Sequence, residues 1–121
     1  INIKNLINLD EWAYAIKSSI KNIEQIISKH DIQYLYITGA SHLSQYPIMM
    51  SNIIKNRTKF ILDNSINKRE KRLYGTSNMC KSFEIINKDL EPYIVLFNSP
   101  YRDEMSNQIK KINSNANIIY A

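Results

Sequence analysis

The chain has 121 residues, of which 44% are hydrophobic and 22% charged; this is the size and composition of one globular domain and excludes a disordered chain. No apolar run approaches the roughly 20 residues that span a bilayer, and the first residues lack a secretory leader pattern, so we expect a cytoplasmic domain without a membrane span. The net charge is +5, but the basic residues cluster only in segment 68–72, which we interpret as a solvated basic loop rather than a nucleic-acid surface.

A leading helix is predicted over residues 10–30. Asp10 is expected to cap its start, and Lys29 and His30 suit the negative end of the helix dipole in its last turn. Apolar residues recur at intervals of three or four, which draws one stripe along a helix. The stripe consists of Trp12, Ile16, Ile20, Ile23 and Ile27.

Short runs of β-branched and aromatic residues predict strands. They cover residues 34–38, 59–62, 93–97 and 117–120, with a brief extended piece at 79–81. The run at 93–97 carries the strongest signal and should be central, and the run at 34–38 should be buried on both faces.

A second helix is expected between the first two strands. Pro47 lacks an N–H and clashes inside a helix, so we place the N-cap at Ser44, which leaves Pro47 in the permitted first turn, and the helix end near Asn56. Its residues expected to face the sheet are Tyr46, Met49 or Met50, Ile53 and Ile54.

Two further helices are predicted in the second half of the chain. Ser82 should cap a short helix that carries Phe83, Ile85 and Ile86, after a turn at residues 74–78. Ser99 as N-cap and Pro100 as the first helical residue should open the last helix. Its buried stripe would be Met105, Ile109 and Ile112.

Strands that alternate with helices imply right-handed crossovers and a parallel sheet covered on both faces. The expected fold is therefore α/β: a Rossmann-like, doubly wound parallel sheet of four to five strands with an added N-terminal helix. We expect one domain over residues 1–121, with the leading helix at 10–30 and the α/β core at 34–121. Because the first residue is Ile1 rather than Met, we expect the domain to belong to a longer protein.

A ligand crevice is expected beyond the carboxyl ends of the strands, where the order of a parallel sheet reverses. Loops that follow the strands at 34–38, 59–62 and 93–97 should converge there, with backbone amides or short polar side chains near helix starts. The candidate ligand-binding residues are Gly39, Ala40, Ser41, His42, Asp63, Asn64, Ser99 and Tyr101.

The first of these loops is not a dinucleotide fingerprint, which needs three spaced glycines. Gly39 stands alone, and Ser41 and Ser44 occupy positions where their side chains would crowd a pyrophosphate. Asp63 follows at about the spacing at which a carboxylate bonds a ribose hydroxyl. The alternative is that Gly39 only supplies a tight turn and Asp63 only ends a strand.

The histidine, cysteine, tyrosine and arginine side chains of the sequence do not identify a catalytic residue. His42 lies in the same loop and could act as an acid or base, whereas His30 serves a helix end. Two histidines and one cysteine without ligand spacing predict no metal site, and we interpret Cys80 as a buried structural thiol. Tyr101 and Arg102 either stack on or pair with a ligand, or form an exposed first turn.

Three segments taken in order carry a family resemblance: YITGAS at 36–41, FILDNS with LYGTS at 60–65 and 73–77, and IVLFNSPYRDEMSNQI at 94–109. Together they resemble the Rossmann-like C-terminal module of sugar C-methyltransferases and, more distantly, the nucleotide-sugar-binding halves of sugar acyltransferases. The resemblance spans residues 10–121. It departs at residues 41–45, where that family has a smaller, glycine-containing phosphate loop.

The resemblance implies a cradle for a nucleotide-sugar or another phosphorylated small molecule in a capsule or surface-polysaccharide enzyme. It also implies that S-adenosylmethionine and the catalytic base belong to preceding domains of the parent chain, so this domain itself holds no cofactor. Two alternatives stay open. One is a structural or protein-interaction module with a vestigial crevice, whose first helix docks on a neighbouring domain; the other is a small enzyme that uses His42.

Overall fold

The structure is a computed structural model of the chain; it describes residues 3–39 and 41–121, with side chains from residue 11 onward except that of His42. Within these residues, five strands form one sheet in the order β3-β2-β1-β4-β5, and every neighbouring pair is parallel. The strands are β1 (Leu35–Thr38), β2 (Thr58–Leu62), β3 (Cys80–Lys81), β4 (Tyr93–Leu96) and β5 (Asn117–Tyr120). The predicted strands are thus confirmed, with boundaries that differ by one residue at several ends.

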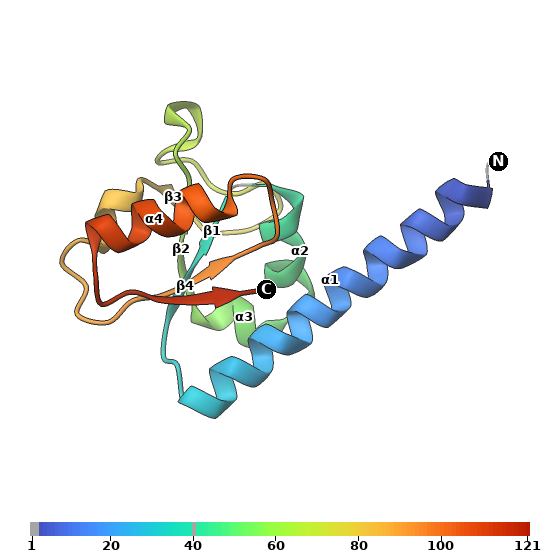
Figure 1. Cartoon of the computed structure of the whole chain (residues 1–121), viewed down its shortest axis with the longest axis horizontal. Helices are drawn as coiled ribbons and strands as arrows, with labels where there is room; N and C mark the ends of the chain where they lie inside the picture. Colours follow the sequence, from blue (N-terminus) through green and yellow to red (C-terminus); the bar gives the residue numbers. More distant parts are fainter. Residues whose placement is uncertain (1–2, 40) are drawn as a thin grey trace.

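Helices cover both faces of this sheet (Figure 1). Because successive strand residues point to opposite faces, Leu35 and Ile37 join one core cluster and Tyr36 joins the other. The first cluster includes side chains from α1 (Ile3–His30), α2 (His42–Met50) and α3 (Asn52–Arg57). The second includes side chains from the 3₁₀ helix η2 (Phe83–Ile86) and from α4 (Arg102–Ile112). The fold is therefore the expected Rossmann-like, doubly wound α/β fold.

Helix α1 is longer than predicted, and the expected N-cap at Asp10 is wrong because the helix already begins at Ile3. An aspartate inside a helix costs only about 0.7 kcal/mol relative to alanine, too little to stop a helix that the flanking residues favour. The predicted stripe is buried from Ile20 onward, whereas Trp12 is 45% exposed. The amino-terminal half of α1 extends away from the sheet (Figure 1).

Helix α2 contradicts the predicted start at Ser44. Its N-cap is Ser41, and Pro47 lies inside the helix, which ends at Met50 before α3 begins at Asn52. The missing Pro47 N–H costs one backbone bond, but burial of the adjacent Ile48 helps to offset that loss. Ile54 is buried, as expected. The prediction of burial is wrong for Met49, Met50 and Ile53, which are exposed, and it is only partly met by Tyr46, which is half-buried.

Helix η2 is capped as predicted, because the Ser82 hydroxyl accepts from the backbone N–H of Glu84. At α4 the prediction is wrong by two residues: the helix begins at Arg102 with Tyr101 as its N-cap. Ser99 forms the preceding turn, since its carbonyl accepts from the Arg102 N–H at 3.2 Å. No helix among the described residues has the length and apolar character needed to cross a membrane.

Candidate functional site

Backbone hydrogen bonds hold the loops at the carboxyl edge of the sheet beside one another. The Gly39 N–H donates to the Leu62 carbonyl at 2.7 Å, and the Asp63 N–H donates to the Lys81 carbonyl at 3.0 Å. In addition, the Thr38 hydroxyl donates to the carbonyl of Val95 at 2.8 Å. The ends of β1, β2 and β4 are therefore neighbours, as the sequence predicted, and the loops that follow them open on the same side.

A cavity of about 560 Å³ lies at this edge, and we call it the crevice. Six of the eight candidate residues line it: Gly39, Ser41, Asp63, Asn64, Ser99 and Tyr101. The other two, Ala40 and the side chain of His42, lie outside the described part of the structure. The rest of the lining comprises Leu62, Lys68, Phe83, Glu104, Met105 and Gln108.

The turn after β1 explains the need for glycine at position 39. Gly39 has φ +81°, a left-handed conformation that side chains disfavour, although an added Cβ would meet no atom within 4 Å. Ser44, which we expected to crowd a phosphate, is instead buried, and its hydroxyl accepts from the Ser41 N–H at 3.1 Å. That expectation was wrong for Ser44, whereas Ser41 is exposed and lines the crevice.

The loop after β2 contributes an acidic and an amide side chain. Asp63 Oδ1 accepts from the Ser65 N–H at 2.7 Å, which holds the carboxylate in a fixed turn. Asn64 and Gln108 of α4 exchange side-chain hydrogen bonds at 3.0 and 2.9 Å, and both residues line the crevice. This loop therefore presents fixed polar groups that suit ligand hydroxyls.

The loop after β4 contains Tyr101 and Arg102, which the sequence offered equally as ligand contacts. Tyr101 is 66% exposed and lines the crevice, so its ring is available to a ligand. The guanidinium of Arg102 instead lies 4.3 Å from the centre of the Tyr120 ring, a cation–π contact within the protein. Of the two, Tyr101 is the better candidate for a ligand contact.

Cys80 lies beside this region without being suited to nucleophilic chemistry. Burial raises the pKa of its thiol, the nearby Asp63 carboxylate raises the pKa further, and Lys68 partly opposes both effects. The thiol is therefore neutral at pH 7 and behaves as an apolar group, in keeping with a structural thiol. Within the described residues, no three histidine, cysteine or carboxylate side chains gather as a metal ion would require.

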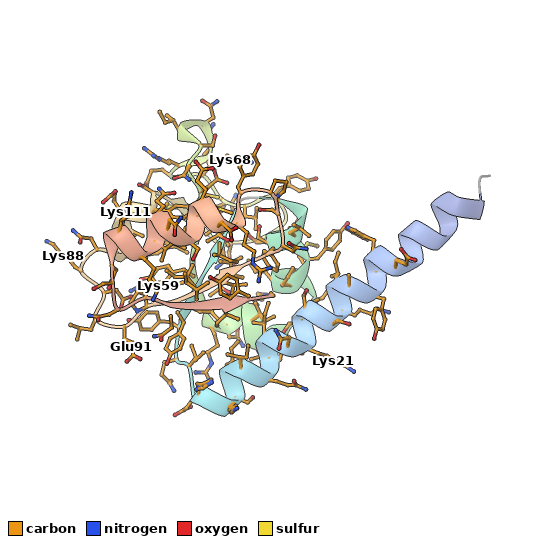
Figure 2. All side chains as sticks on the ribbon, in the orientation of Figure 1. Lys21, Lys59, Lys68, Lys88, Glu91 and Lys111 are labelled. Carbon is orange, nitrogen blue, oxygen red and sulfur yellow. The ribbon has the colours of Figure 1, made fainter. Side chains whose placement is uncertain are left out.

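Sequence reasoning missed the contribution of the basic connection between β2 and β3. Lys68 follows Asp63 by a few positions, lines the crevice, and extends from the projecting segment after β2 (Figure 2). The sequence does not reveal its place at the crevice because the bonds that fold this segment back come from residues 78–80, which no local pattern links to it. Glu104 and Gln108 were missed as well, although their i, i+4 spacing places them on one face of α4.

With these polar, aromatic and basic groups, the crevice has the chemical character of a small-molecule site. Comparison with protein-family models, curated proteins and solved structures finds no match for this chain.

Proposed function

We propose that this domain binds a nucleotide-sugar in the crevice and holds it for chemistry performed by other domains of a surface-polysaccharide sugar-modifying transferase. One observation carries the proposal: loops that follow β1, β2 and β4 line a single cavity of about 560 Å³. That volume lies in the range of small-molecule sites, and its position matches the usual ligand position of open parallel sheets.

The lining residues suit the parts of such a ligand. The Tyr101 ring offers a face on which a base can stack, while Asp63 and Asn64 can accept from or donate to ribose and sugar hydroxyls. Ser41 is the N-cap of α2, and the N-terminus of a helix favours anionic groups. We propose binding alone for this domain, because its resemblance to sugar C-methyltransferase modules implies that the methyl donor and the catalytic base belong to preceding domains.

A matched pair of tyrosine substitutions tests this assignment. Tyr101→Ala removes the proposed stacking surface, while Tyr14→Ala makes the same chemical change on the projecting half of α1, where Tyr14 is 75% exposed. Uridine and thymidine diphosphate glucose should bind the Tyr101→Ala protein about five- to a hundredfold more weakly by calorimetry, the range for one base–aromatic stack. The Tyr14→Ala protein should bind like the wild type.

The binding measurements distinguish a failure of the stacking role from a failure of the proposed function. Equal effects of the two substitutions would remove the stacking role, and a wild-type protein that binds neither nucleotide-sugar would contradict the proposed function itself.

A second candidate function, a protein-interaction module, is favoured by the projecting half of α1. Trp12 and Tyr14 are exposed there although both are large and apolar, and Trp12 makes its ring contact with Tyr46 edge-on at a centroid distance of 5.4 Å. In this alternative the helix docks on a neighbouring domain of the parent chain.

Amide hydrogen exchange over residues 11–19 would test the docking alternative. If the helix docks, exchange should be slower in a protein extended by its native upstream sequence than in this domain alone. Equal exchange in the two proteins would contradict docking.

A further inference from the structure

A second cavity opens directly beside the crevice. It has a volume of about 480 Å³ and is lined by Lys68, Lys71, Arg72, Tyr74 and Cys80 together with Ser41 at the start of α2, among others. We call it the basic pocket. Ser41 and Lys68 line both the crevice and the basic pocket, so the two cavities adjoin at these residues.

The backbone that carries Lys71 and Arg72 is anchored rather than loosely solvated. The Cys80 N–H donates to the Lys71 carbonyl at 2.7 Å, and the Leu73 N–H donates to the Asn78 carbonyl at 2.8 Å. Arg72 also forms an antiparallel bridge with Met79. These bonds fix the backbone of the two residues against the edge of the sheet, while both side chains stay exposed, as the interpretation of this cluster as a solvated loop expected.

The charge balance of the pocket favours an anion. Glu70, the acidic residue within the basic cluster, pairs with Lys81 at 2.6 Å, which leaves its charge compensated. Lys71 and Arg72 make no ion pair with any described residue. Two neighbouring cations that repel each other are stabilised by a ligand with several negative oxygens, and the arginine fork matches phosphate geometry.

We infer that the basic pocket receives the diphosphate of the nucleotide-sugar, an inference that rests on the proposed function. The nucleoside then lies in the crevice against Tyr101, and the phosphates pass between Ser41 and Lys68 toward Lys71 and Arg72. Side-chain cations thus take the role that backbone amides play in a glycine-rich phosphate loop. The turn after β1 has Gly39 as its single glycine. In this arrangement the chain can bind phosphate without a glycine-rich loop.

The test compares two double variants that remove the same charge. Lys71→Gln/Arg72→Gln changes the pocket, and Lys17→Gln/Lys21→Gln changes exposed lysines on α1. All four side chains are exposed, so both variants should fold. The probes are uridine diphosphate glucose, which carries the diphosphate, and uridine, which does not; affinities come from titrations followed by amide chemical shifts.

The inference expects uridine diphosphate glucose to bind the pocket variant at least about tenfold more weakly than the wild type, the factor for one lost charge-assisted hydrogen bond. The α1 variant should stay within about twofold because its charges are remote and screened. Uridine should bind all three proteins equally.

Two negative results are distinguishable. If wild type binds uridine diphosphate glucose and both variants bind it equally well, the pocket does not hold the diphosphate, while the proposed function stands. If wild type does not bind uridine diphosphate glucose, the proposed function fails and the inference fails with it.

Discussion

Asn64 and Gln108 exchange two side-chain hydrogen bonds, Asn64 Nδ2 to Gln108 Oε1 at 3.0 Å and Gln108 Nε2 to Asn64 Oδ1 at 2.9 Å. The pair joins the loop after β2 to α4, although the two residues lie 44 positions apart in the chain. Because both line the crevice, this amide pair fixes the spacing between two of its walls. A ligand in the crevice would therefore meet a wall that is already in position.

A double-mutant cycle measures what this pair contributes. Asn64→Ala, Gln108→Ala and the double variant should show a coupling free energy of about 0.5–1 kcal/mol in urea unfolding, because the bonds are exposed and each net contribution is modest. Coupling near zero would mean that the pair does not hold the two walls together in solution.

Gly39 should be required for its backbone conformation rather than for space. With φ +81° and open space around an added Cβ, Gly39→Ala should lower the free energy of unfolding by about 1–2 kcal/mol, the cost of a left-handed alanine. Gly39→Asn should cost less, since asparagine tolerates this region better. Denaturant unfolding of both variants checks the order, and equal losses would contradict the conformational explanation.

The carboxy-terminal half of α1 should contribute strongly to stability. Ile23 is fully buried in the core cluster that α1 shares with the sheet, so Ile23→Ala should lower the free energy of unfolding by about 2–5 kcal/mol. Ile53→Ala, the same change at a side chain that is 42% exposed on α3, serves as the control and should cost about 1 kcal/mol or less. Similar losses at both positions would show that α1 does not pack on the sheet in solution.

The opposite edge of the sheet carries a pH-dependent contact. Asp89 accepts hydrogen bonds from the hydroxyls of Tyr34 and Tyr36, each at 2.9 Å. Burial and then the bond to Asp89 raise the pKa of Tyr36 well above its ordinary value of 10.0. The folded protein therefore keeps this proton at a pH where the unfolded chain releases it.

The sign of the effect follows from proton linkage. The stabilisation is complete below about pH 10 and is lost as the pH rises through the raised pKa of folded Tyr36. Tyr36→Phe should cost about 1 kcal/mol at neutral pH, for one lost hydrogen bond, and should lose less stability than wild type between neutral pH and about pH 11. Parallel stability curves for the two proteins over that range would contradict the assignment to Tyr36.

Residue patterns were enough to predict the sheet because its strands are short, buried and β-branched. Ile94, Val95 and Leu96 favour no other element at that length, and the helices between strands left a parallel sheet as the consistent arrangement. The convergence of Gly39, Asp63 and Ser99 followed from topology alone, since parallel strands end at the same edge.

Details that depend on tertiary contacts were not predictable in this way. The rule against proline inside a helix placed the start of α2 wrongly, because the rule ignores the burial of Ile48 and the capping by Ser41. The backbone anchoring of Lys71 and Arg72 was not predicted, since it depends on bonds from segment 71–73 to Asn78 and Cys80. Such long-range pairing leaves no trace in the spacing of residues along the chain.

The most direct test of the central claim is an amide chemical-shift titration of the wild-type domain with uridine diphosphate glucose. The proposed function predicts shifts that occur together at Gly39 and Ser41, at Asp63 and Asn64, and at Ser99 and Tyr101, with one shared affinity. Absence of shifts, or shifts confined to α1 or to the edge around Tyr34 and Asp89, would contradict it.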